Sequence, residues 1–351
     1  MRCPTLKGLP PPPPGRTGWP WTEESAPWTH AMPGGRPWRR VSIVTPSYNQ
    51  GEFIEETIRS VLLQGYPNLE YIIIDGGSSD ATVETIQKYS SSLASWVSER
   101  DRGQTHAINT GFRRATGEIL AWLNADDTYA AAAISTAVAA MSTDAGPAFV
   151  YADCQQIDEA GRPLVLYKGA CDGLESFLLF RACVPQPTTF FRRSLLDEVG
   201  YLDESLEYAM DCEFFLRVAA RHDLRYIPRV LANYRVHSAS KTSKAFLASS
   251  REHIAAVRNY WGLAGTLRRH RYYWAARNRE ANAHLHCSYE SLIHDRRTAV
   301  AHIAHAVALY PPILFGRDTM SQLLQVVVGP GRVRAAKRRL GLDRAKFGPS
   351  I

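Results

Sequence analysis

The sequence predicts an α/β fold in which a mainly parallel, Rossmann-like sheet is flanked by helices, with a helical C-terminal extension. Two observations predict it. From Val41 onward, short apolar runs alternate with segments of helical period, which is typical of β-α-β units. Beyond about Phe246 only helical patterns remain. With 351 residues, 45% of them apolar and 21% charged, the chain has the composition of a folded protein with a large core.

The first unit of the pattern is a strand at 41–45 (VSIVT) followed by a helix. We assign the helix N-cap to Asn49, because Glu52 follows three residues later as in a capping box. The helix shows an apolar face with the spacing i, i+4, i+7, i+8, made of Ile54, Ile58, Val61 and Leu62. Gly65 and Pro67 end it.

The following units repeat this alternation. Strands are predicted at 71–74 (YIII), at 96–97 and at 119–123, and a helix with an apolar face is predicted over 107–115. The second half is less regular. There we expect strands at 149–151 and 188–191, a helix over 211–220, and one or two strands within 226–235.

Composition suggests three parts. Residues 1–40 contain the run Pro10–Pro14 and no apolar period, which predicts a disordered, proline-rich leader. Residues 41–245 would form the α/β domain, and 246–351 a basic helical extension. From Arg251 onward there are 17 Lys and Arg against 6 Asp and Glu, so this part carries about +11 while the preceding residues carry about −4.

No run approaches the roughly 18–20 apolar residues of a membrane span, and no apolar segment follows the first basic residues. We therefore expect a cytoplasmic protein. The six cysteines lack zinc-site spacing, so we expect reduced, mostly buried thiols. The basic tail, which includes Arg332 and Lys346, is either a solvated helix face or a contact with the inner face of the membrane near a lipid-linked acceptor. His284, His286, His302 and His305 are expected at solvated helix positions.

Acidic residues follow three consecutive predicted strands: Asp75, Asp101 and the pair Asp126–Asp127. A single aspartate at such a position is more often a turn or cap residue. Together they would line one crevice, because the carboxyl ends of parallel strands meet at one edge of the sheet. The segment 124–127 (NADD) offers the oxygen ligands that a divalent cation shares with phosphates, although alone it could be a solvated turn.

The two runs VTPSYNQGEFIEETIRSVLLQGYPNLEYIIIDGGSSDAT and DRGQTHAINTGFRRATGEILAWLNADD resemble the family 2 glycosyltransferases. That family has the GT-A fold, a Rossmann-like architecture of nucleotide-diphospho-sugar transferases. The resemblance is close over about 41–129 and looser to about His237. It implies a Mg²⁺- or Mn²⁺-dependent, inverting transfer of a sugar to a hydroxyl, in cell-surface polysaccharide or glycolipid synthesis.

The resemblance also implies roles for residues. Asp126 matches the metal-binding aspartate, with His237 as a second candidate ligand. Asp211 matches the general base, although Met210 stands where the family often has Glu. A base is needed because an acceptor hydroxyl is a poor nucleophile until it loses its proton. The nucleotide-sugar contacts would come from Thr45, Pro46, Ser47, Tyr48, Asn49, Asp75, Gly76, Gly77, Ser78, Asp101, Gly103, Gln104, Asn109, Asn124, Ala125, Asp127 and Arg235.

Within these contacts, Asp75 would recognise a uracil or thymine base, so the donor would be UDP- or TDP-linked. Three other functions remain as alternatives. A nucleotidyltransferase would need a basic loop after the first strand, and 47–53 contains no Lys or Arg. A nucleic-acid-binding protein would explain the pI of 9.1, but no recognised binding motif accompanies the charge. A catalytically inactive sugar-nucleotide-binding module would bind metal weakly.

Overall fold

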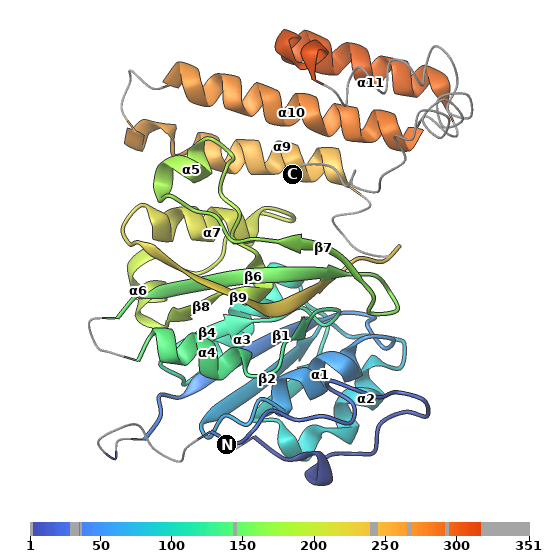
Figure 1. Ribbon diagram of the computed structural model, residues 1–351, viewed down its shortest axis with the longest axis vertical. Coiled ribbons are helices and arrows are strands. Elements are labelled where there is room, and N and C mark those ends of the chain that lie inside the picture. Colours follow the sequence, from blue (N-terminus) through green and yellow to red (C-terminus); the bar gives the residue numbers. More distant parts are fainter. Residues whose placement is uncertain are drawn as a thin grey trace. The chain divides into compact units, whose positions relative to one another are not determined.

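The computed structural model describes residues 3–28, 35, 37–142, 146–238, 245–264, 269–291 and 295–316. Its contacts divide the chain into two compact units. The first, Met1–Leu174 with Arg181–His237, contains the sheet. The second, Glu175–Phe180 with Ser238–Ile351, contains the three long helices drawn in orange in Figure 1.

The first half of the sheet is parallel, as predicted. Its strands are β1 (Val41–Ser47), β2 (Leu69–Asp75), β3 (Ser95–Ser98) and β4 (Ile119–Trp122). Helices α1 (Ile54–Leu62), α2 (Thr82–Lys88) and α3 (Gln104–Arg114) connect them. The order is β3-β2-β1-β4, so the chain moves outward from β1 to β3 and then returns to the other side of β1. This reversal lies between β1 and β4, where open α/β sheets bind ligands.

The second half is mixed. It contains β5 (Thr128–Tyr129), β6 (Phe149–Ile157), β7 (Pro163–Tyr167), β8 (Phe190–Arg192) and β9 (Leu224–Arg235), joined by α4 (Ala133–Ala140), α5 (Leu174–Leu178), α6 (Ser194–Val199) and α7 (Met210–Ala219). Most of its pairings are antiparallel, but β6 runs parallel to β9. All nine strands within the described residues join one sheet. The strand expected at 188–191 begins only at Phe190, and the region 226–235 is a single strand.

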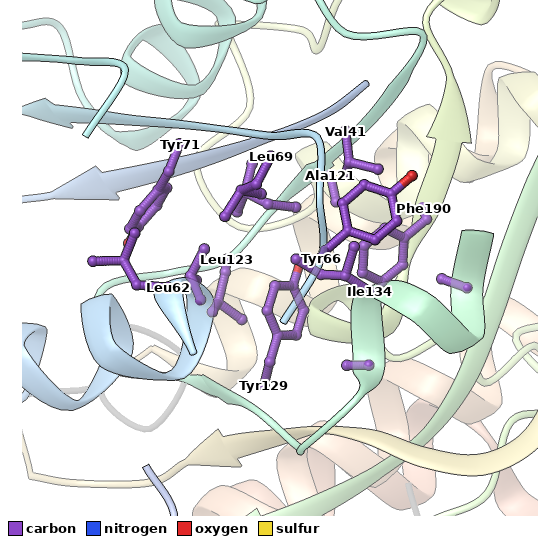
Figure 2. Packing of buried hydrophobic residues seen from close by; sticks show 14 of the residues in the cluster. Val41, Leu62, Tyr66, Leu69, Tyr71, Ala121, Leu123, Tyr129, Ile134 and Phe190 are labelled. Atoms are coloured by element: carbon purple, nitrogen blue, oxygen red, sulfur yellow. The ribbon is translucent and has the colours of Figure 1, made fainter. Parts of the chain in front are cut away.

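The core lies between the sheet and its helices (Figure 2). Apolar side chains of β1, β2 and β4, such as Val41, Tyr71 and Ala121, meet Leu62 of α1 and Ile134 of α4. Each is at most 1% exposed. The parallel strands read as continuous apolar runs because both faces of this part of the sheet are covered.

The expectation of a disordered leader is wrong for residues 3–28, which pack onto the first unit. Leu9 and Trp21 are buried, and the fully buried guanidinium of Arg59 in α1 donates to the carbonyls of Pro10, Pro20 and Trp21 at 2.8–3.1 Å. A proline-rich stretch leaves carbonyls without partners along the chain, and a buried cation supplies donors for them. Composition alone did not reveal this partner.

The assignment of Asn49 as the cap of α1 is also wrong. The helix begins at Ile54 after Phe53, with no side-chain cap. Asn49 instead has a φ of 51°, in the left-handed region, and its side chain accepts from the amide of Ser79. Asn tolerates the left-handed region, so Asn49 stabilises the turn after β1 and does not cap the helix.

The second unit contains α9 (Phe246–Arg258), α10 (Arg269–Ser291) and α11 (Arg296–Leu309), as expected for a helical extension. None of the helices in the described ranges is long and apolar enough to cross a membrane. His284 is only 5% exposed, so the expectation of a solvated position is wrong for it. Its Nδ1 lies 2.9 Å from that of His302. The basic residues from Arg332 onward lie outside the described residues.

Candidate functional site

The loops after β1 and β2 are bonded to each other. The Gly76 amide donates to the Ser47 carbonyl at 2.8 Å, and the Asn49 amide donates to the Ser78 hydroxyl at 2.8 Å. Tyr48, between them, is 63% exposed. The Ser47 hydroxyl is buried and has no hydrogen-bond partner among the described residues. These loops therefore present the exposed ring of Tyr48, while Pro46 and the Ser47 hydroxyl are buried.

Asp75 is fully buried, and its carboxylate organises the loop that follows it. One oxygen accepts from the amides of Gly77 and Ser78 at 3.1 and 2.9 Å and from the Ser98 hydroxyl at 2.6 Å. The other oxygen accepts from the Ser78 hydroxyl. A carboxylate with this many donors is already satisfied within the protein. In this arrangement the Asp75 carboxylate holds the loop after β2 in place.

Asp101 stands beside this loop at the end of β3. A Cβ at position 76 would lie 3.0 Å from the Asp101 carboxylate, so a larger residue there would require that carboxylate to shift. Asp101 in turn accepts from the Gly103 amide at 2.8 Å. Gly103 has a φ of 112° and precedes the first turn of α3. The ends of β2 and β3 are thus in contact, as the spacing predicted.

A chain of amide side chains links α3 to the loop after β4. Gln104 Nε2 donates to Asn124 Oδ1 at 2.8 Å, and Asn124 Nδ2 lies 3.3 Å from both Asp127 Oδ2 and Gln186 Oε1. Gln186 is fixed through its own bond to the Trp122 carbonyl at 2.8 Å. Asn124 stands where a carboxylate is usual, and here it serves as a junction between these groups.

The side chains of Asp126 and His237 meet at this edge. Oδ2 of Asp126 lies 3.0 Å from Nε2 of His237, with the aspartate side chain 20% exposed and the imidazole 4% exposed. The Phe53 ring packs against the imidazole, with ring centres 4.7 Å apart. Partial exposure leaves the carboxylate accessible, while the packed ring fixes the direction of the imidazole.

Arg235 holds the end of β9 against the loop after β4. Its backbone amide donates to Asp127 Oδ1 at 2.9 Å and its Nε to the Asp126 carbonyl at 2.9 Å. Its guanidinium forms an ion pair with Glu56 at 3.0 Å and lies over the Phe53 ring. The side chain is 1% exposed. We therefore infer that Arg235 supports the loop from below, and that a direct contact with a diphosphate would require movement.

Asp127 is buried under the same loop. Burial and the neighbouring Asp126 carboxylate raise its pKa well above the usual range, while hydrogen bonds from the Arg235 amide and from Asn124 oppose the shift. Both of its oxygens are used within the protein, so it does not replace a carboxylate at position 124 as a surface ligand. Ala125, before it, is also buried.

Two further predicted contacts are buried supports. The Thr45 hydroxyl pairs with that of Tyr71 inside the sheet at 3.0 Å. Asn109 exchanges hydrogen bonds with the backbone of Leu202 at 2.9 and 3.1 Å. Neither residue presents a polar group to the crevice.

Asp211 lies in the first turn of α7 and is partly exposed. Its Oδ1 accepts from the Cys212 amide at 2.7 Å. Phe214, three residues later on the same face of the helix, packs against Trp122 of β4 with ring centres 6.4 Å apart. Helix α7 therefore packs against β4 through Phe214, in the turn that follows Asp211.

Sequence reasoning missed Phe53, Glu56 and Gln186. Phe53 and Glu56 surround Arg235, and Gln186 joins Asn124 to the sheet. None of the three directly follows a predicted strand. Glu56 offered one weak signal, since it is one of two acidic residues in the first turn of α1.

The donor set fits a divalent cation. Asp126 and His237 bring a carboxylate oxygen and an imidazole nitrogen to one point, and both are accepted ligands of Mn²⁺. No group of three or more His, Cys, Asp or Glu within the described ranges could hold a metal by itself. Such a pair is typical of ions that complete their coordination with substrate phosphates and water.

Comparisons with known proteins identify the family of the chain. The family model described as Glycosyl transferase family 2 matches residues 42–200. An uncharacterized glycosyltransferase of Mycobacterium tuberculosis is 32% identical over 186 residues, which are 51% of this chain and 68% of that protein. The chain spans about two thirds of the length of the curated relatives that it matches first.

Two solved structures share the fold. The structure of S. aureus TarS 1-349 in complex with UDP-GlcNAc has a TM-score of 0.53 at 17% identity, covering 86% of this chain and 92% of that chain. The mannosyltransferase PcManGT from Pyrobaculum calidifontis, in complex with GDP-Man and Mn²⁺, has a TM-score of 0.52 at 19% identity, covering 86% and 88%. At these identities the likeness extends to the fold alone.

Proposed function

The chain belongs to glycosyltransferase family 2, and from that premise we propose that it transfers a sugar from a nucleotide-diphosphate sugar to an acceptor hydroxyl with inversion. The observation that carries the proposal is the meeting of Asp126, in the loop after β4, with His237, in the loop after β9. The Asp126 carboxylate is accessible, and the His237 imidazole beside it is fixed by packing. Hydrogen bonds within the protein hold the loop that carries Asp126, so the two ligands are positioned before a cation binds. A solvated turn, the alternative for residues 124–127, would not require this arrangement.

We propose a UDP- or TDP-linked donor. The nucleotide would lie over the loops after β1 and β2, where Tyr48 offers an exposed ring, and Asp75 would recognise the base as the resemblance implies. Related folds hold UDP-GlcNAc in one case and GDP-Man in another, so the base must be tested directly.

In the proposed reaction, the carboxylate of Asp211 accepts the proton of the acceptor hydroxyl as its oxygen attacks the anomeric carbon. The new bond forms on the face opposite the diphosphate, and the bond from the anomeric carbon to the diphosphate oxygen breaks. The electron pair leaves with the nucleoside diphosphate. Asp126 and His237 would hold a Mg²⁺ or Mn²⁺ ion, which neutralises charge on a diphosphate.

We propose that the acceptor belongs to a cell-surface polysaccharide or glycolipid. The first turns of α10 support a location near a membrane, because Tyr273 and Trp274 are 44% and 46% exposed beside the exposed Arg269. Exposed aromatic rings among cationic side chains are typical of proteins that rest on anionic lipid. We call the residues Arg269, Arg271, Tyr273 and Trp274 the α10 surface. Arg271 in it pairs with Glu175 at 3.2 Å.

The test measures donor binding and hydrolysis over UDP-, TDP- and GDP-sugars with Mn²⁺ or Mg²⁺. Wild type is compared with Asp126→Ala and Asp211→Asn, and with Asp197→Ala as a matched control, since Asp197 is an exposed aspartate of α6. We expect Asp126→Ala to lose metal-dependent binding. Asp211→Asn should keep donor binding and lose turnover, and the control should behave as wild type.

Other results would change the proposal. If donor binds with metal but no acceptor or water receives the sugar, the chain is an inactive sugar-nucleotide-binding module. If no nucleotide sugar binds with either metal, the proposed function is wrong.

A further inference from the structure

Helix α1 turns a row of buried polar side chains toward the segment that contains Asp126. Thr57 and Ser60 lie three residues apart on one side of α1, and Gln64 follows four residues later, two residues beyond the end of the helix. They are 0%, 0% and 1% exposed. Polar groups this deeply buried need partners, since an unsatisfied one costs free energy of folding.

Thr57 bonds the backbone on both sides of Asp126. Its Oγ1 lies 2.9 Å from the Ala125 carbonyl oxygen and 2.7 Å from the Asp127 carbonyl oxygen. One hydroxyl proton is therefore shared between the two carbonyls that flank Asp126 in the sequence. The Asp126 carbonyl itself accepts from Arg235 Nε. Three consecutive carbonyls of this loop are thus bonded to side chains, and Thr57 holds two of them.

Ser60, one turn further along α1, and Gln64, two residues beyond its end, continue the same pattern. The Ser60 hydroxyl accepts from the Tyr129 amide at 3.1 Å. Gln64 Nε2 donates to the Ala130 carbonyl at 2.9 Å, and its Oε1 accepts from the Ile134 amide at 3.2 Å. Helix α1 and Gln64 together therefore bond the backbone of residues 125–134, from the loop after β4 to the first turn of α4.

We propose that Thr57 is a positioning residue for the metal-binding carboxylate of Asp126. This rests on the proposed function. By holding the carbonyls of residues 125 and 127, Thr57 fixes the backbone from which the Asp126 side chain reaches His237. The competing interpretation is that Thr57 only fills the core. The two interpretations predict different results for a variant that keeps the shape of Thr57, loses its hydroxyl and still folds. A positioning role predicts weaker metal binding, whereas a core-filling role predicts unchanged metal binding.

The experiment compares Thr57→Val, which keeps the shape and removes the donor, with Thr57→Ser, which keeps the donor. Thr57→Ala is a second variant in case the valine methyl disturbs the loop. Ser42→Ala is the control. Ser42 is also fully buried, and its hydroxyl bonds Glu70 and the Gly117 amide at the opposite end of β1. Mn²⁺ affinity is measured on the full chain by calorimetry with nucleoside diphosphate present, and stability by thermal unfolding.

We expect Thr57→Val to weaken Mn²⁺ binding about 10- to 100-fold, as is common when a partner that orients a metal ligand is lost. Thr57→Ser should stay close to wild type. Ser42→Ala should unfold at a lower temperature with unchanged Mn²⁺ affinity. The proposal is overturned if wild type binds Mn²⁺ and Thr57→Val and Thr57→Ala bind it equally tightly. If wild type binds the nucleotide and no Mn²⁺, the metal part of the proposed function fails and the role of Thr57 fails with it.

Discussion

His237 Nε2 lies 3.0 Å from Asp126 Oδ2, although 111 residues separate them in the chain. The pairing of β5 with β9 brings them together, because Thr128 lies opposite Asn233 in antiparallel register. Arg235 also donates hydrogen bonds to the Asp126 carbonyl and to the Asp127 carboxylate, in the loop between β4 and β5. A strand end and a loop from distant parts of the sequence are thus fixed against each other before any ligand binds.

Replacing Arg235 by Met should destabilise the first unit strongly. The change removes the donors to the Asp126, Asp158 and Glu159 carbonyls and leaves Glu56 without its cation. Breaking a buried ion pair from one side costs about 3–5 kcal/mol. Urea unfolding measures the loss. Arg162→Met is the control, since that side chain is 80% exposed in its ion pair with Asp158 and should change little. Equal effects of the two changes would contradict the supporting role of Arg235.

Arg59→Met should release the N-terminal segment from α1. The carbonyls of Pro10, Pro20 and Trp21 would lose their buried donor, and Tyr89 would lose a partner at 3.1 Å. Each buried group left unsatisfied costs about 1–3 kcal/mol. We expect limited proteolysis to cut within 3–28 faster than in wild type. Lys7→Met, at an exposed position of the same segment, should keep the wild-type cleavage pattern. Unchanged cleavage in Arg59→Met would mean that apolar contacts alone hold the segment.

The helical unit should lose stability in mild acid. Burial lowers the pKa of His284 below its ordinary value, with His302, Arg251 and His305 adding to the shift and Glu280 opposing it. Burial and His305 likewise lower the pKa of His302. An unfolded histidine titrates near pH 6.5, so the unfolded chain binds these protons more readily. The contribution is present above about pH 6.5 and is lost as the pH falls through the lowered values.

Circular dichroism melts at pH 7.5 and pH 5 measure this effect. Wild type should melt at a lower temperature at pH 5, and His284→Leu should show a smaller difference between the two pH values. His270→Leu is the control, because His270 is an exposed histidine at the second position of α10. A full wild-type difference in His284→Leu would show that other groups carry the pH dependence.

Trp274→Ala should weaken binding to anionic vesicles. The ring is 46% exposed on the α10 surface, and its loss removes an aromatic group suited to the lipid interface. Cosedimentation with phosphatidylglycerol vesicles at low salt measures binding, with phosphatidylcholine vesicles for comparison. Tyr289→Ala is the matched control, since that ring is 58% exposed near the other end of α10. If wild type stays in solution with anionic vesicles, the membrane contact is wrong.

The alternation of apolar runs and helical periods predicted β1 to β4 and the helices between them, because in covered parallel strands and amphipathic helices each element's own residues carry the pattern. The same reading placed Asp75, Asp101 and Asp126 at one edge. The pattern did not predict contacts between residues that are far apart in the sequence. It missed that Arg59 anchors the leader and that Thr57 bonds the loop around Asp126.

The sequence by itself thus determined the order of elements, the edge that carries the carboxylates and the family. Tertiary structure alone decided which carboxylates stay accessible. Asp126 remains partly exposed beside His237, whereas Asp75 and Asp127 are buried and bonded within the protein. The physical reason is that the residue pattern of a chain segment determines whether that segment forms a helix or a strand, and where the element ends. The burial and bonding of a polar group depend on which distant segments pack against it.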